Sequence, residues 1–147
     1  MVEIAIKRLE YLCDTIPQLL TRIGETDFSL KPSNDKWSKK EIIGHLIDSA
    51  ANNHQRFVRG QFEQVPLISY DQNKWNKFSF HQQIEGQQII NFWTIYNKHL
   101  VEIIRRITNE NLQRECKNGD NKHLTLDFLI NDYVEHLEHH LRQVVNY

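Results

Sequence analysis

Apolar residues recur at spacings of three and four positions in four long stretches of the chain. That period places them on one face of an α-helix, so each stretch predicts an amphipathic helix with one side suited to burial. The predicted helices cover residues 2–23, 38–60 and 80–107, and a last stretch that begins at residue 125. No segment alternates with a period of two for long enough to predict a sheet.

Several residues mark where these helices begin or are interrupted. Ser38, with Glu41 three residues later, forms the capping-box pattern that opens a helix. Thr125 is a good N-cap residue for the last helix, with Asp127 in its first turn. Pro17 lies inside the first stretch and removes a backbone donor there, which predicts a kink or break near residues 15–17.

The segments between the helices differ in character. Residues 61–79 show no sustained period and predict a long loop, and such loops in compact domains are often functional. The run Asn-Gly-Asp-Asn at residues 118–121 predicts a turn. Four helices of comparable length bury their apolar faces best against one another. The sequence therefore predicts an all-α, up-and-down four-helix bundle that forms a single domain over residues 1–147.

Composition and charge exclude several classes of protein. Of the 147 residues, 39% are hydrophobic and 25% charged, which is typical of a globular chain, and the formal net charge is −1. This charge provides no basic surplus for binding nucleic acid. No apolar run approaches the roughly 18 residues that span a bilayer, and the first residues lack the features of a signal peptide. With only Cys13 and Cys116, in no disulfide or redox spacing, we expect a cytoplasmic protein without membrane or nucleic-acid partners.

Histidine is the one residue type that is unusually frequent, with eight copies. His136 and His140 lie four residues apart, so their side chains project from the same face of the last helix and are able to bind one metal ion. His139 is offset from His140 by about 100° and is predicted to face solvent. His45 borders the apolar face of the second helix. The alternatives are a surface pair of histidines on the last helix and a hydrogen-bonded boundary residue at position 45.

Polar residues that share a helix face with these histidines are candidates for binding a substrate. Ser49, Asn52 and Arg56 project within about 40° of the direction of His45. Arg56 lies roughly 16 Å from His45 along the helix axis, where a guanidinium could hold a carboxylate or phosphate at the far end of a long substrate. A surface salt bridge is the alternative for this arginine. On the last helix, the residues in line with the histidine pair are Tyr133 and Gln143.

Two aspartates are candidate general bases for hydrolysis, which needs a group that accepts a proton from the attacking water. Asp48 lies one turn beyond His45, and Asp71 lies in the predicted loop. The remaining histidines are interpreted as ordinary surface or loop residues; they are His54, His81, His99 and His123.

Two segments of the chain resemble the DinB-like family. The family pattern Trp-Ser-x-x-Glu-(Ile/Leu)-x-x-His-Leu is matched within KPSNDKWSKKEIIGHLIDSA, and the pattern His-x-x-His-His-x-x-Gln is matched within EHLEHHLRQV. The segment SYDQNKW is similar to the loop that follows the second helix in that family. The resemblance extends over nearly the whole chain in order and spacing, and it is most specific in the two histidine segments.

The resemblance implies an up-and-down four-helix bundle, often a homodimer, that holds a divalent metal with three histidines. By motif position these are His45, His136 and His140. The family includes thiol-dependent S-transferases such as bacillithiol transferases, mycothiol-dependent isomerases, and proteins described as metal-dependent hydrolases. Three imidazoles suit zinc or nickel among other metals.

Three functions remain open on this reading. The first is a metal-dependent S-transferase that joins a low-molecular-weight thiol, as co-substrate, to a small electrophilic substrate. The second is a metal-dependent hydrolase that uses metal-bound water. The third is a non-catalytic metal-binding module that dimerises.

Overall fold

The computed structural model describes all 147 residues and is dominated by four long helices. In chain order the elements are α1 (Val2–Thr21), α2 (Glu25–Phe28), α3 (Lys39–Arg59), α4 (Gln72–Phe78), the 3-10 helix η1 (His81–Gln83), α5 (Gly86–Ile104), α6 (Asn109–Leu112), β1 (Glu115–Lys117), β2 (His123–Thr125) and α7 (Leu126–Leu141).

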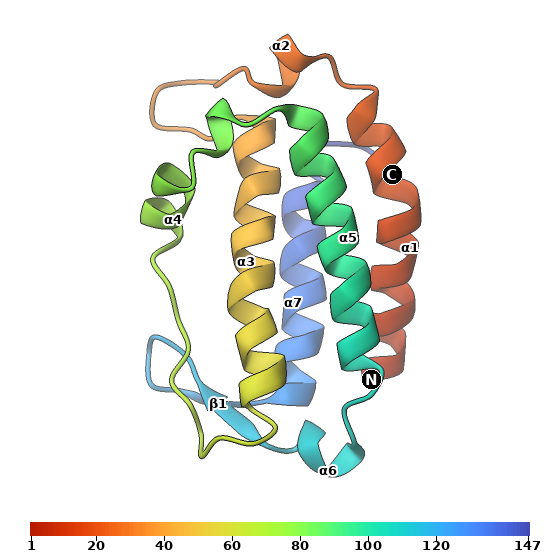
Figure 1. Cartoon of the computed structure of the whole chain (residues 1–147), viewed down its shortest axis with the longest axis vertical. Helices are drawn as coiled ribbons and strands as arrows, with labels where there is room; N and C mark the ends of the chain where they lie inside the picture. The colour runs from red at the N-terminus through yellow and green to blue at the C-terminus, as the bar shows by residue number, and fades with distance from the viewer.

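The four long helices pack as a bundle, which confirms the predicted all-α four-helix architecture (Figure 1). α1 and α3 each pack against both α5 and α7, so α1 lies diagonally opposite α3. The helices run up and down the long axis in the order up, down, down, up, because α3 and α5 point the same way (Figure 1). Residues 61–85, here named the crossover, must therefore return along the outside of the bundle between these two parallel helices.

One apolar core runs through the bundle. It contains 31 buried hydrophobic residues, drawn mainly from the inward faces of the four long helices. Among the largest fully buried side chains are Trp93 of α5, Phe57 of α3 and Tyr133 of α7. None of the helices combines the length and the apolar composition that crossing a membrane would require.

The predicted break in the first helix is wrong. α1 continues from Val2 to Thr21 with Pro17 inside it. A proline removes only one backbone donor. The helix is held against the core by eight buried side chains in all, which lie both before Pro17, as Leu12 does, and after it, as Leu20 does. The Thr21 hydroxyl donates a hydrogen bond of 2.9 Å to the carbonyl of Pro17 in the same turn.

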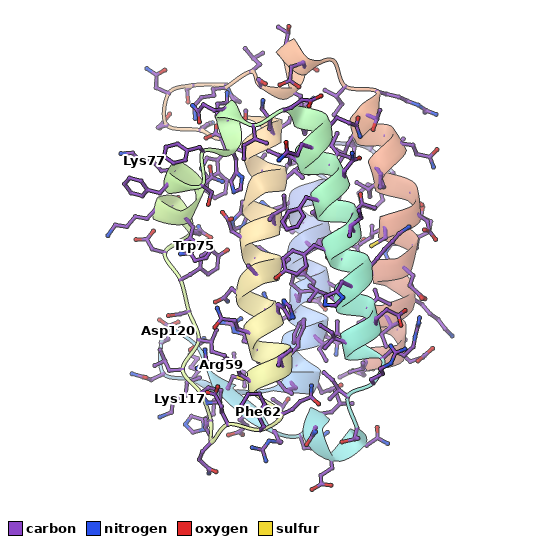
Figure 2. All side chains as sticks on the ribbon, viewed as in Figure 1. Arg59, Phe62, Trp75, Lys77, Lys117 and Asp120 are labelled. Carbon is purple, nitrogen blue, oxygen red and sulfur yellow. The ribbon has the colours of Figure 1, made fainter.

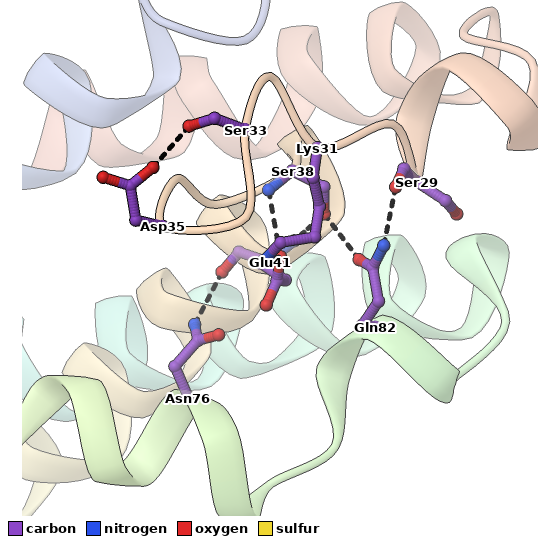
Figure 3. A network of polar contacts seen from close by, with 8 residues as sticks. All are labelled: Ser29, Lys31, Ser33, Asp35, Ser38, Glu41, Asn76 and Gln82. Carbon is purple, nitrogen blue, oxygen red and sulfur yellow. Dashed lines mark hydrogen bonds and ion pairs between the residues drawn. The ribbon is translucent and has the colours of Figure 1, made fainter.

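The start of α3 has the predicted capping box and is the centre of a polar network (Figure 3). The Ser38 hydroxyl accepts from the backbone N–H of Glu41, whose carboxylate accepts from the backbone N–H of Ser38, both at 3.0 Å. The Ser38 hydroxyl also donates to Gln82 at 2.6 Å, and Asn76 donates to the Glu41 carbonyl. The cap thus joins the start of α3 to α4 and η1, in the later part of the crossover.

The crossover contains more structure than the predicted loop. Asp71 caps α4 by accepting from the backbone N–H groups of Asn73 and Lys74. The third long helix begins at Gly86 rather than at Phe80, because Phe80 adopts a left-handed conformation with φ 57 and η1 follows it. α4 lies at the edge of the molecule, where it carries Trp75 and Lys77 (Figure 2).

A short β-hairpin also departs from the prediction of no sheet. β1 and β2 pair antiparallel over three residues each, with the predicted turn between them. The hairpin closes the lower end of α3 (Figure 2), where Arg114 donates to the carbonyls of Gly60 and Glu63. Strands of this length are too short to show an alternating pattern in the sequence.

Candidate metal centre

Three histidines from facing helices meet at one point of the bundle. His45 projects from α3, while His136 and His140 lie one turn apart on the same face of α7. The Nε2 atoms of His45 and His136 are 3.4 Å apart, and one potential ligand nitrogen from each of the three residues lies within 4.8 Å of the other two. The structure therefore brings together the three histidines that the sequence singled out.

The spacing of these nitrogens suits a metal ion. Two zinc–imidazole bonds of about 2.0–2.1 Å at a tetrahedral angle place their nitrogens about 3.3–3.4 Å apart. The observed separation between His45 and His136 matches that value. The ring centroids of His45 and His140 are 4.8 Å apart, which places the third imidazole beside the same point.

The three imidazoles are held in the form that binds metals. Burial, together with charge repulsion from the neighbouring His136 and His140, lowers the pKa of His45 to about 3. Burial likewise lowers the pKa of His136 to about 4, with repulsion from His140 as the second cause. The pKa of His140 is also lowered by burial. All three rings are neutral near pH 7, and neutral imidazole is the metal-binding state.

Neighbouring side chains set the orientation of the rings. The Nδ1 atom of His140 lies 3.1 Å from the Oε1 atom of Gln143, so Nδ1 carries the proton and Nε2 is free for a metal. His45 is held by packing, since the Trp37 ring lies 4.9 Å from its centroid. The Nδ1 atom of His45 is buried and has no hydrogen-bond partner. His139 is exposed, as predicted.

A cleft of about 290 Å³ opens beside His136. α3 and α7 form its two walls, and the crossover and the hairpin turn form its rim. Of the predicted substrate-binding residues, four lie in its lining; they are Ser49, Asn52, Arg56 and Tyr133. The fifth, Gln143, is outside the cleft and contacts His140 instead.

Tyr133 and Arg56 present different groups to the cleft. The Tyr133 hydroxyl donates a 2.6 Å hydrogen bond to Asn97 in the core, so this tyrosine presents its ring to the cleft rather than its hydroxyl. Arg56 is half-buried and makes no ion pair, so the alternative of a surface salt bridge is wrong. Its guanidinium donates to the carbonyl of Ile68 at 3.0 Å and to Asn53 at 3.3 Å.

Neither candidate general base faces the cleft. Asp48 is buried, and its two carboxylate oxygens each lie 3.1 Å from Nε2 of His81. Asp71 is the N-cap of α4. The prediction of His81 as an ordinary surface or loop residue is wrong: it is buried, and its ring packs on Gly44, where a Cβ would lie 2.2 Å from its Cγ atom.

The other histidines lie away from the three-histidine cluster. His99 and His123 are exposed, and His54 is partly exposed. The Nδ1 atom of His54 lies 2.9 Å from the Tyr96 hydroxyl on the outer side of the bundle.

Among the cleft residues that were not predicted from the sequence, Asp132 and Tyr70 carry ionisable side chains. Asp132 of α7 lies one turn before His136, so the same spacing of four that pairs the histidines could have identified it. Tyr70 comes from the crossover, and only the fold brings it to Ser49. Burial and the charge of Asp48 raise the pKa of Tyr70 to about 12, so its phenol stays protonated and can donate a hydrogen bond.

Comparison of the sequence with known families gives a match to the DinB superfamily over residues 8–144. A relative from Bacillus subtilis (strain 168), named "Putative metal-dependent hydrolase YfiT", is 24% identical over 141 residues, which cover 95% of this chain and 79% of the relative. A "Putative metal-dependent hydrolase" from Oceanobacillus iheyensis is 20% identical over 140 residues, covering 95% of this chain and 80% of that protein.

Solved structures show the same fold. The structure of YfiT from Bacillus subtilis is described as a probable metal-dependent hydrolase with an unusual four-helix bundle topology. It matches with a TM-score of 0.88 at 20% identity, over 97% of this chain and 83% of that chain. A mutant of the mycothiol-dependent maleylpyruvate isomerase matches with a TM-score of 0.79 at 8% identity, over 100% of this chain and 62% of that chain.

Proposed function

Because this chain belongs to the DinB superfamily, we propose that it is a metal-dependent enzyme that transfers a small thiol to an electrophilic substrate. The observation that carries the proposal is the cluster of three neutral histidines, one of which, His136, also lines a cleft that contains a half-buried arginine. In this proposal His45, His136 and His140 bind a divalent ion, zinc or nickel. Three protein ligands leave a coordination position open for a substrate.

The donor set fits such an ion. A divalent metal bound there supplies Lewis acidity, which lowers the pKa of a thiol that coordinates it and so supplies a nucleophile at neutral pH. Gln143 holds the proton of His140 on Nδ1 and keeps Nε2 directed toward the other two rings. Ser49, Asn52 and Tyr70 line the cleft together with His136 and can hydrogen-bond a substrate there.

Thiol transfer fits the placement of the predicted bases better than hydrolysis does. A thiol activated in this way needs no general base during attack, whereas hydrolysis uses a positioned group to accept the proton of water. Asp48 is bonded to His81, and Asp71 caps α4. Support for a thiol also comes from the fold of the mycothiol-dependent isomerase.

Hydrolysis is the second candidate, and Asp132 is the observation that favours it. This aspartate lines the cleft one turn from His136, so its carboxylate is placed to accept a proton. The relatives named as hydrolases agree with that candidate.

Assays of thiol transfer and of ester hydrolysis on the same metal-loaded sample discriminate the transferase from the hydrolase. We expect zinc- or nickel-loaded protein to accelerate the reaction of cysteine or another small thiol with monochlorobimane, and to leave p-nitrophenyl acetate unhydrolysed. His140→Ala should lose the thiol reaction, while His139→Ala, a matched change one residue away, should retain it. Ester hydrolysis that depends on His140 and Asp132, with no thiol transfer, would instead assign the protein as a hydrolase.

A further inference from the structure

The cleft contains one full positive and one full negative charge. Arg56 comes from the α3 wall and Asp132 from the α7 wall. Apart from His136, which is neutral near pH 7, the other side chains of the lining are uncharged; they are Ser49, Asn52, Asn53, Ser69, Tyr70, Gln72 and Tyr133, beside Gly119. A bound molecule therefore meets a guanidinium on one side and a carboxylate on the other.

These two charged groups do not neutralise each other. The ion pairs of the structure, which extend to 4.0 Å, do not include Arg56 or Asp132. Burial lowers the pKa of Arg56, and the charge of Asp132 partly opposes that effect, so the two groups are near enough to interact. Asp132 is exposed to the cleft and makes no hydrogen bond within the chain.

The guanidinium is oriented but incompletely satisfied. Arg56 donates one hydrogen bond to the Ile68 carbonyl and one to the Asn53 side chain, and its Nε atom is buried without a partner. A guanidinium has five N–H donors in a planar fork that suits a carboxylate. A half-buried charge that is fixed in direction and lacks a counterion is suited to a ligand's anion.

We propose that the cleft recognises a zwitterionic, amino-acid-like molecule, with its carboxylate on Arg56 and its ammonium group on Asp132. The inference rests on the proposed function in one respect only. If the protein transfers a thiol, the group that such a molecule directs toward His136 is its thiol. Recognition of both charges would select an aminothiol acid over a simple thiol.

The balance of charge in the cleft favours a carboxylate over a phosphate. A phosphate monoester carries close to two negative charges at neutral pH, and the cleft offers one guanidinium with a carboxylate on the facing helix. A zwitterion meets one opposite charge at each end and leaves neither Arg56 nor Asp132 unpaired. Leaving a desolvated charge unpaired is costly, so matching both ends gives selectivity.

Ligands without a thiol test this recognition separately from the chemistry. L-2-aminobutyrate carries both charges, butyrate lacks the ammonium group, and propylamine lacks the carboxylate. Dissociation constants would be measured by NMR titration of zinc-loaded protein, with inorganic phosphate as a fourth ligand. We expect L-2-aminobutyrate to bind about tenfold more tightly than each of the other three.

Variants assign each charge to its residue. Arg56→Gln should weaken L-2-aminobutyrate and butyrate about tenfold and leave propylamine unchanged. Asp132→Asn should weaken L-2-aminobutyrate and propylamine and leave butyrate unchanged. Controls are Arg59→Gln, on the same helix but paired with Glu63 outside the cleft, and Glu135→Gln on the exposed side of α7. Both controls should bind all ligands as the wild type does.

The results also separate folding and catalysis from recognition. If Arg56→Gln disturbs the crossover, Arg56→Lys is the alternative variant, because it removes the guanidinium but keeps the positive charge. Asp132 is exposed, so Asp132→Asn tests the proposal independently of Arg56. Equal weakening of all ligands by either variant, tighter binding of phosphate, or no preference in the wild type would overturn the inference. Absence of thiol transfer together with the predicted binding pattern would reject the proposed function and retain the zwitterion site.

Discussion

The Nε2 atom of His81 lies 3.1 Å from both carboxylate oxygens of Asp48, and both residues are buried. This pair attaches the crossover to α3 at the turn that carries His45. The histidine ring reaches that position because residue 44 is glycine, so its ring lies where a Cβ would otherwise be. The three-histidine cluster and the crossover are thus held in register by residues that lie outside the lining of the cleft.

Gly44→Ala should destabilise the protein by roughly 2 kcal/mol. The added Cβ would lie 2.2 Å from Cγ of His81, and overpacking of this kind costs about 1–3 kcal/mol even though alanine favours helix. Urea denaturation measures the change. Gly24→Ala is the control, because a Cβ there meets nothing within 4 Å. Equal stability of the two variants would show that His81 moves aside freely.

Single histidine variants should divide into two groups by metal content. His45→Ala, His136→Ala and His140→Ala should each lose most bound zinc or nickel after dialysis, because each removes one of three ligands. His139→Ala should keep a full complement, since His139 is exposed. Elemental analysis of the purified variants measures this. A full site in His140→Ala with an empty one in His139→Ala would reject the assignment of the ligand pair.

Gln143→Ala should weaken metal binding about tenfold to a hundredfold without abolishing it. The amide oxygen accepts the proton of His140 Nδ1, and loss of such an outer partner costs about that much in affinity. Competition with a chelator measures the constant. Gln143→Glu, which keeps an acceptor, should restore binding, whereas a merely structural role for Gln143 would leave both variants alike.

Glu25→Gln should lower stability by about 0.5–1 kcal/mol at pH 7, since the Glu25 side chain is 58% exposed, and by less at pH 3. The Lys40 ammonium group is buried, and its hydrogen bond to Glu25 at 2.6 Å lowers the pKa of that carboxyl below its ordinary 4.5. A lowered folded-state pKa gives stability above the unfolded value that is lost as the pH falls through the folded value. Unfolding free energies of both proteins measured at the two pH values test this.

Asp27→Asn serves as the control for that comparison. Asp27 pairs with Lys39 at 3.6 Å, and its side chain is 65% exposed, so its loss should change stability by less than about 0.5 kcal/mol at either pH. A difference between wild type and Glu25→Gln that is as large at pH 3 as at pH 7 would mean that the charge of Glu25 is not responsible.

We propose that two copies of the chain associate through the outer face of α5. Phe92 is 52% exposed and Ile95 is 67% exposed on that face, one turn apart, so the two form adjacent apolar side chains that a second copy could cover. Light scattering should give twice the mass of one chain for the wild type and a single mass for Ile95→Glu. The same change at Ile4, on α1, should leave the dimer intact. A monomeric wild type would reject the proposal.

The long helices and their caps were predictable because their signals are local. The capping box at Ser38 and the N-cap at Thr125 both lie where the sequence indicated. Helix periodicity placed His136 and His140 on one face of their helix and His45 beside the apolar face of its own, whereas the grouping of all three was implied by the resemblance to the DinB-like family. The inferences from caps and periodicity use only residues within one or two turns of each other.

The parts that were missed depend on contacts between distant segments. The burial of His81 depends on a glycine 37 positions earlier in the chain, and Tyr70 enters the cleft only because the crossover returns along α3. α4 is a different case, because Asp71 is a good N-cap residue and its signal was present. Its seven residues were too few to show a helical period.

The crossover gives the molecule two parts that can vary separately. The four long helices supply the core and the histidines, whereas the crossover supplies Ser69, Tyr70 and Gln72 to the rim and fixes Arg56 through the Ile68 carbonyl. Replacement of these rim residues can alter which molecules enter without touching a histidine or a core side chain. Exchange of this one connection between related bundles is therefore a route by which a single metal-binding scaffold acquires new substrates.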